Sequence, residues 1–462
     1  MGERTKRQAL SPINTTPKPP IRRKQEVSME KIIEFSLTFL MWITIGFVFL
    51  YLPRIFGWFG AMLPQKRLKN NEKSRFALLV PARNESLAIG DLFRSIEKQD
   101  YDPSFFDVHV IVKEPDDPTI AMAKKEGFFI HVVTEQTCKG DALDGALKAI
   151  LSGGEKYDAY LIIDADCALA PDFLSRMNDA MASGADVICA KKLVKNHLPE
   201  KKGTSSIWSD CNGLIWTLID DMGNRFKSDH AITCMTVGTG LLLRGTLIEK
   251  LGGWPYRETL TEDIELMYDC AASGYTTYYT SYAKCYVEES PLHGMTNKRR
   301  RRWMRGVVAS RRLYRKKLRQ GGSLKNRYYT TALGLTYLYM GICTLYFLLF
   351  GCASLFMMLA GSPLAFRMLI PALAGFGAIY LSFFLMTACA LIVEGKNLPH
   401  SFSRKLTLLF VHPLFYMEYI RIVGDALLFR KESRGWEVIE RVESESDLAE
   451  VSETEEAQVS VL

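Results

Sequence analysis

Three long apolar stretches restrict what this chain of 462 residues can fold into. Residues 32–52, 328–366 and 368–393 together contain one charged side chain, that of Glu34. About 20 consecutive apolar residues form a helix long enough to cross the hydrocarbon core of a bilayer. The sequence therefore predicts an integral membrane protein, with membrane helices on both sides of a soluble region.

Composition divides the remainder of the chain. The formal net charge of +7 is concentrated in a few segments, and the last part of the chain is acidic. Segments rich in charge or proline and poor in apolar residues bury too little surface to fold alone. We expect a disordered basic tail (1–31), a transmembrane anchor with an interfacial segment (32–64), a soluble domain (75–310), a basic juxtamembrane helix (311–327), two transmembrane helices (328–394), an interfacial or third transmembrane helix (406–429) and an acidic C-terminal tail (436–462).

Basic residues around the two later membrane helices indicate their orientation. Residues 298–319 contain 12 Lys or Arg and no acid, and Lys396, Arg404 and Lys405 follow the second helix, whereas the intervening loop carries only Arg367. Positively charged flanks stay on the cytosolic side of a membrane. We therefore expect the soluble domain to face the cytosol, in a protein of the cell membrane. Basic residues flank both ends of the first membrane segment and give it no direction.

The last apolar segment has a mixed character. Its first half is apolar, and Glu418, Arg421 and Asp425 follow at helical spacing. Charged side chains on one face suit a helix that lies in the membrane interface. We favour an interfacial helix over a full crossing for this segment.

A strand, loop and helix pattern repeats through the soluble region. The expected strands are Phe76–Val80, Val108–Val112, Phe129–Val133 and the apolar run that begins at Ala159, and helical segments follow the first three. Alternation of this kind predicts a mostly parallel sheet with helices on its faces. The fold class is therefore α/β, with additional α-helical transmembrane segments.

Two carboxylates follow the fourth expected strand. Asp164 and Asp166 end the run AYLIIDADC, and side chains two residues apart in an extended segment point the same way. Open α/β sheets bind ligands at the carboxyl ends of their strands. Mg²⁺ or Mn²⁺ held by such carboxylates and by substrate phosphates would relieve their repulsion. An Asp-rich turn is the alternative, and these two residues alone do not decide between them.

Several classes of protein lack support in the sequence. No G-x-G-x-x-G follows the first strand and no G-x-x-x-x-G-K-[ST] occurs, which counts against a dinucleotide oxidoreductase and a P-loop enzyme. Ten cysteines without C-x-x-C pairs count against a disulfide framework or a zinc site. The basic segment 298–319 could suit nucleic acid, but it leads directly into a membrane segment. Lipid headgroups and substrate phosphates explain it better, and we expect no nucleic-acid partner.

Two further motifs allow both a functional and a structural interpretation. Glu262 and Asp263 open an expected helix after Thr261, where helix capping and the helix dipole alone would favour acids. Val237–Leu243 (VGTGLLL) contains two glycines that let a backbone approach a ligand closely. A glycine bulge in a strand is the alternative for the second motif.

Six short motifs occur in a consistent order between residues 75 and 310. They are PARNES at Pro81, CKGDAL at Cys138, DADC at Asp164, GTG at Gly238, TED at Thr261 and RRRRW at Arg299. This ordered set, followed by membrane segments, resembles the membrane-bound family 2 glycosyltransferases, which include cellulose, chitin and hyaluronan synthases and ceramide glucosyltransferase. The resemblance implies a GT-A nucleotide-sugar-binding fold and inverting transfer of a sugar.

The resemblance also implies contacts to the nucleotide. Ala82, Arg83 and Glu85 match the loop that meets the base and ribose, and Lys139 with Gly140 matches a second nucleotide contact. In many relatives the second strand ends in an Asp that binds the nucleotide. This chain has Lys113 and Glu114 there, and Glu114 is the expected substitute.

The remaining matches concern the reaction itself. Asp164 and Asp166 match the carboxylates that bind a divalent metal, Mg²⁺ or Mn²⁺, and the sugar nucleotide. Asp263 matches the catalytic base, with Glu262 beside it. The resemblance implies that the base activates an acceptor hydroxyl, which attacks opposite the leaving group and forms a β-linkage from an α-linked donor.

The basic motif departs from its usual form. Arg302 and Trp303 match the R-W of the Q/R-x-x-R-W motif near the diphosphate and the acceptor, and Arg299 stands where polymerising relatives commonly have Gln. An Arg at this place also resembles ceramide glucosyltransferase. Trp303 could carry a sugar ring or lipid on its flat face, or could anchor the membrane interface.

The resemblance leaves several functions open. We favour transfer of a hexose from a nucleotide sugar, expected to be UDP-linked, to a hydroxyl of a lipid or growing glycan. A processive polysaccharide synthase is the alternative, although few membrane helices and Arg299 count against it. A catalytically inactive membrane scaffold comes from another class, and a nucleotidyltransferase would leave the TED and R-x-x-R-W motifs without a role. No motif fixes the donor sugar, the acceptor or the oligomeric state.

Overall fold

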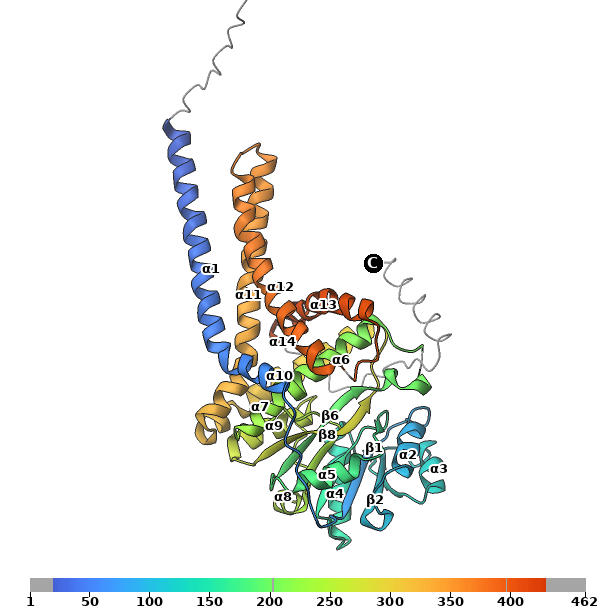
Figure 1. The fold of residues 1–462 in the computed structure, drawn as a ribbon. Coiled ribbons are helices and arrows are strands. Elements are labelled where there is room, and N and C mark those ends of the chain that lie inside the picture. The colour runs from blue at the N-terminus through green and yellow to red at the C-terminus, as the bar shows by residue number, and fades with distance from the viewer. Residues whose placement is uncertain (1–19, 202, 396, 429–462) are drawn as a thin grey trace, which may run out of the picture. The chain divides into compact units, whose positions relative to one another are not determined.

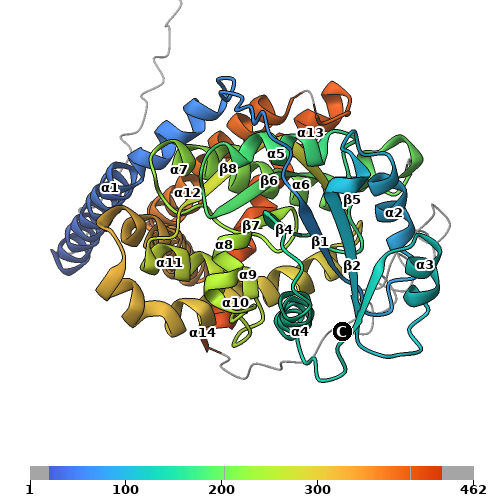
Figure 2. The ribbon, with the colours of Figure 1, turned by 90° about the horizontal axis from the view of Figure 1, so that it is seen from below.

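The computed structural model describes residues 20–201, 203–395 and 397–428 (Figures 1 and 2). The chain forms two compact units, one within 1–47 and 341–378 and the other within 48–340 and 379–462. The expected acidic tail at 436–462 lies outside the described residues. The candidate active site belongs wholly to the second unit.

An eight-stranded sheet forms the centre of the second unit. Its strands are β1 (Phe76–Pro81), β2 (Phe106–Val112), β3 (Phe129–Val132), β4 (Ala159–Ile162), β5 (Ala168–Leu169), β6 (Val187–Val194), β7 (Leu241–Arg244) and β8 (Thr277–Val287), in the order β3-β2-β1-β4-β7-β6-β8-β5. β3, β2, β1 and β4 pair in parallel, as do β6 and β8, whereas β7 is antiparallel to both neighbours and β5 is antiparallel to β8. The sheet is therefore mixed but mostly parallel, which confirms the expected α/β class.

The helices fall between these strands and beyond them. They are α1 (Pro20–Ala61), α2 (Ile89–Glu97), α3 (Thr119–Lys125), α4 (Lys139–Ser152), α5 (Phe173–Met181), α6 (Ile207–Ile219), α7 (Arg225–Asp229), α8 (Gly245–Leu251), α9 (Glu262–Ser273), α10 (His293–Gly321), α11 (Leu324–Leu359), α12 (Ala365–Glu394), α13 (Phe402–Met417) and α14 (Tyr419–Leu428). Short 3₁₀ turns occupy Pro103–Phe105, Lys195–His197 and Pro199–Lys201, and a π-helical turn occupies Asp220–Asn224.

The sheet is buried on both faces because successive side chains of each strand point to opposite sides. Phe76, Leu78 and Val80 of β1 join a hydrophobic core with α2 and α5, whereas Ala77 and Leu79 join a second core with α4 and α8. Figure 2 shows α5 and α4 on opposite sides of β1. Continuous apolar strands are expected in a sheet that helices cover on both faces.

Trp208, Leu214, Ile215 and Leu218 stand on one side of a helical repeat and predict a single amphipathic helix from Ser205 to Phe226, but the structure divides this stretch. It contains α6, the π-helical turn and the start of α7. In the turn, Asp220 lies 2.9 Å from the ammonium of the buried Lys192 on β6. Burying such a charge without its partner would be costly, so the ion pair outweighs regular helical hydrogen bonding at this point.

The N-terminal helix begins before the expected membrane segment. α1 starts at Pro20, so the expected disordered tail is helical from residue 20, while residues 1–19 lie outside the described residues. An established helix adds one hydrogen bond for each further residue it fixes, and so it can extend into a polar segment. α1 also joins the expected anchor to the expected interfacial segment, with Pro53 inside the helix.

Four described helical segments are long and apolar enough to cross a membrane. They are Ser28–Ala61, Leu324–Leu359, Ala365–Glu394 and Phe402–Leu428. The last segment consists of α13 and α14, with Glu418 between them. The Glu418 carboxylate forms ion pairs with Arg300 and, at 2.7 Å, with His293 of α10. A carboxylate held by two partners of the soluble region thus stands in the middle of this segment.

Candidate active site

The loops at one edge of the sheet bring the predicted motifs together. Because β1, β4, β6 and β8 run in the same direction, their carboxyl ends meet at one edge, where the antiparallel β7 begins. Arg83 follows β1, Asp164 follows β4, Lys195 follows β6, Glu288 follows β8, and Gly238 precedes β7. Ligand sites of open α/β sheets form at this kind of edge.

A cavity of about 620 Å³ lies at this edge. Every residue that the sequence assigned to the site lines it, with the exception of Ala82, Gly140 and Glu114. Three distant motifs, DADC, GTG and TED, therefore share one cavity with the basic motif of α10.

Lys139 connects the DADC and TED motifs. Its ammonium donates hydrogen bonds to Asp164 Oδ1 and, at 2.7 Å, to the carbonyl of Gly238, and it lies 3.5 Å from Glu262 Oε1. Burial opposes its charge, but the carboxylates of Asp164 and Glu262 outweigh burial and hold the pKa of Lys139 above its usual value. The ammonium stays charged and brings the two acids to one point.

Asp263 lies against the same loop. A Cβ atom placed on Gly238 would stand 3.4 Å from Asp263 Oδ2 and 3.0 Å from Lys139 Nζ, which shows how closely this backbone approaches both groups. The N–H of Ile264 donates to Asp263 Oδ1 at 2.8 Å. Burial and the neighbouring charge of Glu262 raise the pKa of Asp263 to about 7. A carboxylate with a pKa near neutrality is suited to accept a proton.

Asp164 and Asp166 offer ligands for a divalent cation. Their carboxylates and the Cys167 thiol carry ligand atoms within 4.8 Å of one another. A hydrogen bond with Cys285 and burial raise the pKa of Cys167 well above its usual value, and Mg²⁺ and Mn²⁺ prefer oxygen ligands to sulfur. Carboxylate oxygens suit Mg²⁺ and Mn²⁺, which retain positions for phosphate oxygens. The residues present therefore fit the expected cation through oxygen ligands alone.

Six residues of α10 line the cavity, among them Arg299, Arg302 and Trp303 of the basic motif, which stand at helical spacing. The Arg299 guanidinium lies 3.3 Å from Glu289 Oε2 and 4.9 Å from the centre of the Trp303 ring. Arg302 lines the cavity and forms no ion pair with any residue that the structure describes. Burial and nearby Arg299 lower the pKa of Arg302, which shows that positive charge is concentrated here. Such a guanidinium suits the oxygens of a diphosphate.

Three residues matched to nucleotide contacts do not line the cavity, and their contact with a nucleotide stays a prediction. Ala82 is buried, and its N–H continues the ladder to β2 with a 2.8 Å hydrogen bond, so its side chain points into the core. Glu114 lies outside the cavity wall, 3.8 Å from Arg83. Gly140 packs against a backbone carbonyl, which leaves no room for a side chain. Arg83 and Glu85 of the same motif do line the cavity.

The sequence analysis missed the acids after β8. Glu288 and Glu289 line the cavity, and the fully buried Glu289 accepts a 2.8 Å hydrogen bond from Trp216 Nε1 and pairs with Arg299. Burial raises the pKa of Glu289, and Arg299 opposes this shift. The signal was available, because two acids follow a strand there just as Asp164 follows β4.

The cavity wall also includes residues of all four segments that could cross a membrane. Tyr51 and Arg54 come from α1, Tyr329 from α11, Met386 from α12 and Tyr416 from α13. Arg54 donates a 2.9 Å hydrogen bond to the carbonyl of Tyr329. The charged groups at the sheet edge therefore share their cavity with a mainly aromatic and apolar wall.

Comparisons with known proteins identify the family of the chain. The profile of a family described as glycosyl transferase family group 2 matches residues 160–393, about half of the chain. A curated relative, Probable glycosyltransferase YdaM of Bacillus subtilis (strain 168), is 24% identical over 261 residues, which cover 54% of this chain and 59% of that protein. The chain thus spans less than two thirds of the length of this relative.

One solved structure shows the same fold, and a second matches more weakly. Mannosyltransferase PcManGT from Pyrobaculum calidifontis, in complex with GDP-Man and Mn²⁺, matches with a TM-score of 0.51 and 19% identity, over 85% of this chain and 100% of that chain. S. aureus TarS 1-349 in complex with UDP-GlcNAc matches with a TM-score of 0.37 and 14% identity, over 75% of this chain and 92% of that chain. The likeness to PcManGT confirms the expected GT-A-like fold.

Proposed function

Because the chain belongs to glycosyl transferase family group 2, we propose that it transfers a sugar from a nucleotide-sugar donor to an acceptor held at a membrane. One observation carries this proposal: Lys139, Asp164 and Asp263 line the same cavity as residues of four helices long enough to cross a membrane. A scaffold without activity would not need an acid of raised pKa beside a buried ammonium.

The donor would bind at the sheet edge. Arg83 and Glu85 would contact the base and ribose, and Arg302 would bind the diphosphate, since it lines the cavity without an acidic partner among the described residues. Asp164 and Asp166 would hold Mg²⁺ or Mn²⁺, which supplies positive charge to the departing diphosphate. PcManGT, solved with GDP-Man and Mn²⁺, supports this type of donor, and a UDP-linked hexose remains our first expectation.

Asp263 would act as the general base. Its carboxylate takes the proton of an acceptor hydroxyl, whose oxygen attacks the anomeric carbon on the side opposite the nucleotide. The bond to the diphosphate breaks as the new bond forms, so the anomeric centre inverts and an α-linked donor gives a β-linked product. Lys139 and the backbone of Gly238 hold the acids in place during this step.

The acceptor would reach the cavity from the membrane. Tyr329, Met386 and Tyr416 give the wall an apolar part that suits a lipid better than a hydrated sugar chain. Exposed apolar side chains on the membrane-length helices, such as Phe35 and Leu359, favour an integral membrane protein. We propose that the catalytic region faces the cytosol, that α13 and α14 lie in the interface, and that one sugar is added to a lipid hydroxyl.

Purified full-length chain, incubated with radiolabelled UDP- and GDP-sugars, Mn²⁺ or Mg²⁺ and a membrane lipid extract, tests this proposal. We expect release of nucleotide and label in the organic phase. Label in a high-molecular-weight ladder on a gel would favour the processive synthase instead. Failure to release nucleotide from any donor would contradict the transferase, and full activity in excess chelator would contradict the role of Asp164 and Asp166.

A further inference from the structure

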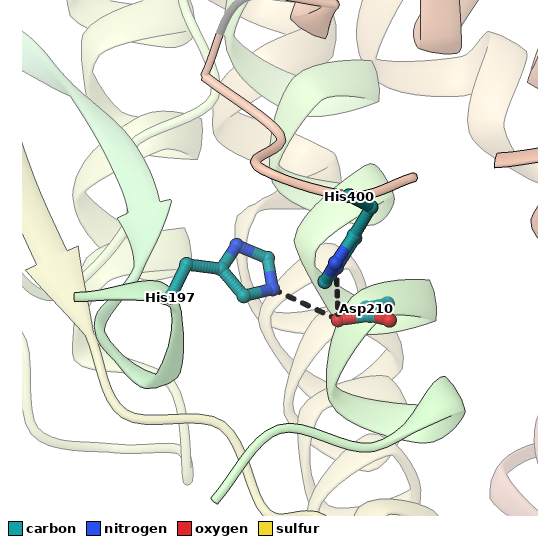
Figure 3. A group of neighbouring side chains, drawn as sticks. All are labelled: His197, Asp210 and His400. Atoms are coloured by element: carbon teal, nitrogen blue, oxygen red, sulfur yellow. Dashed lines mark hydrogen bonds and ion pairs between the residues drawn. The ribbon is translucent and has the colours of Figure 1, made fainter. Parts of the chain in front are cut away.

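A second cluster of ligating side chains lies outside the cavity. His197 ends the 3₁₀ turn after β6, Asp210 lies in the first turn of α6, and His400 precedes α13. Figure 3 shows both imidazoles directed at the Asp210 carboxylate from separate segments of the chain. None of the three residues lines the catalytic cavity. The sequence analysis assigned no role to them, since they share no motif.

The three groups converge closely and away from solvent. His197 Nε2 lies 2.8 Å and His400 Nε2 lies 2.9 Å from the same oxygen, Asp210 Oδ1. The side chains of His197, Asp210 and His400 are 9%, 0% and 14% exposed. All three ligand atoms lie within 4.8 Å of one another. Two nitrogens and one carboxylate oxygen therefore face a single point inside the protein.

Hydrogen bonding alone does not account for the cluster. The His400 Nε2 is buried and has no hydrogen-bond partner of acceptable geometry, although Asp210 Oδ1 is close to it. Buried polar atoms are normally satisfied, and an exception calls for a partner such as an ion. Asp210 Oδ1 lies against both imidazole nitrogens and places a carboxylate oxygen at the same point.

We propose that His197, Asp210 and His400 bind a divalent transition-metal ion of the Zn²⁺ type, at a site separate from the Asp164 and Asp166 cation. Two imidazoles and one carboxylate form a common ligand set for such ions, whereas Mg²⁺ and Mn²⁺ prefer oxygen ligands. Ligand atoms of a tetrahedral zinc site stand about 3.3 Å apart, so the imidazoles need to move from Asp210 Oδ1 by only about half an ångström.

Arg404 is the charged group closest to this site. Its guanidinium lies 2.8 Å from Asp210 Oδ2, the oxygen that the imidazoles do not contact. Its positive charge opposes a cation, but it also fixes the carboxylate with Oδ1 turned toward the imidazoles. Outer partners of this kind commonly orient metal ligands.

The site would hold α13 to the catalytic region. His400 directly precedes α13 and Arg404 lies in its first turn, and α13 packs against α6. His197 lies two residues after Lys195. Lys195 donates a 3.0 Å hydrogen bond to the backbone carbonyl of Asp166. A bound ion would thus stabilise the folded protein by mass action and would fix a turn that contacts the DADC motif.

Zinc binding to purified full-length protein in nanodiscs tests the proposal. Metal-free protein is titrated with Zn²⁺ by calorimetry, and a Co²⁺-loaded sample is examined by visible absorption. His197→Gln and His400→Gln are the test variants, because a glutamine amide can still donate a hydrogen bond to Asp210 but is a poor transition-metal ligand. His230→Ala is the matched control for loss of an exposed imidazole, and Asp164→Asn with Asp166→Asn removes the other cation site.

We expect one Zn²⁺ per wild-type chain, with an affinity unchanged by His230→Ala and by the paired Asp164 and Asp166 substitutions. Each Gln variant should weaken Zn²⁺ binding at least about 100-fold, because it removes a direct ligand, whereas loss of a residue that only orients a ligand costs about 10- to 100-fold. Each should also lose the visible absorption band of bound Co²⁺. Zn²⁺ should raise the unfolding temperature of wild type and of the control only. Absence of Zn²⁺ binding by folded wild-type protein, or equal binding by the Gln variants, would overturn the proposal. If the Gln variants do not fold, X-ray absorption of the Zn²⁺-loaded wild type decides, since a shell without imidazole nitrogen would overturn it as well.

Discussion

The chemistry of Asp263 depends on three neighbours that the chain places around it. Glu262 and burial raise the pKa of its carboxyl to about 7, while Lys139 works in the opposite direction. The Ile264 N–H fixes one oxygen, and the second lies near the Gly238 backbone and the cavity. A base needs both a suitable pKa and a fixed orientation, and this residue has both.

Replacement of this base should remove turnover and leave donor binding intact. Asp263→Asn keeps the shape of the side chain but cannot accept the acceptor proton, so kcat should fall by about 10² to 10⁴. Calorimetric titration with the nucleotide product should give an unchanged Kd. Asp229→Asn, which changes an exposed acid on α7, is the control and should keep full activity. Near-normal turnover of the Asp263 variant would show that another carboxylate is the base.

The raised pKa of Asp263 also predicts a pH dependence. Because the base form is required, kcat/KM should fall about tenfold for each pH unit below about 7. The folded protein holds this proton at pH values where an unfolded chain has already lost it, so protonation favours the folded state as pH falls from about 7 toward the usual Asp range. A profile that stays flat down to pH 5 would contradict this prediction.

Most of the site residues predicted from motifs line the cavity, but the motifs did not show which way each side chain faces. Lys139, Asp164 and Asp263 could be found from short motifs, and all three line the cavity. The motif of Ala82 did not show that its side chain is buried in the core, which the position of its backbone beside β2 determines. The role of Glu289 was not recognised from sequence, because its partner Trp216 lies 73 residues earlier in the chain.

At the scale of elements, the edge of the sheet determines the site. Loops after β1, β4, β6 and β8 and the loop before β7 meet there, and the first residues of α4 and α9 supply Lys139 and Glu262. Gly238 occupies the closest approach between these elements.

A methyl group at Gly238 should therefore disturb the site more than the fold. The Cβ of Gly238→Ala would stand 3.0 Å from Lys139 Nζ, so this ammonium, which holds Asp164 and Glu262, must shift, while Asp263 Oδ2 at 3.4 Å and Glu262 Oε1 at 3.5 Å would be in ordinary contact. We expect kcat/KM to fall at least about tenfold, which corresponds to about 1.4 kcal/mol of transition-state stabilisation. Gly424→Ala on α14, with no atom within 4 Å of the new methyl group, is the matched control. Equal activity of the two variants would contradict the proposed close approach.

Local sequence patterns predicted the bounds of those strands that depend on their own apolar residues. β1 to β3 and the start of β4 lie within two residues of their expected bounds, because runs of apolar residues need a buried sheet. The π-helical turn after α6 could not be predicted from local sequence, because Asp220 in this turn pairs with the buried Lys192 of β6. The start of α1 at Pro20 likewise depends on the helix that follows it.

At the scale of the whole molecule, the basic residues around α11 and α12 predict which side of a membrane each part would occupy. The loop between α11 and α12 carries one basic residue, Arg367, whereas basic residues are abundant before α11 and after α12. This asymmetry favours an external loop and a cytosolic catalytic region.

Cysteine labelling of intact cells tests that orientation. Ser362→Cys in the loop between α11 and α12 should react with a membrane-impermeant maleimide from outside the cell. Ser152→Cys, at the exposed end of α4, should react only after lysis. Labelling of the unmodified chain gives the background from native cysteines. The reverse pattern would place the catalytic region outside and contradict the proposed topology.

The shared wall of the cavity has a kinetic consequence. A water-soluble donor would arrive by diffusion in three dimensions, while a lipid acceptor would arrive by lateral diffusion in a bilayer leaflet. Turnover would then follow the mole fraction of acceptor in the surrounding lipid rather than its amount per volume of solution, and dilution with inert lipid should slow the reaction even when the total acceptor is unchanged.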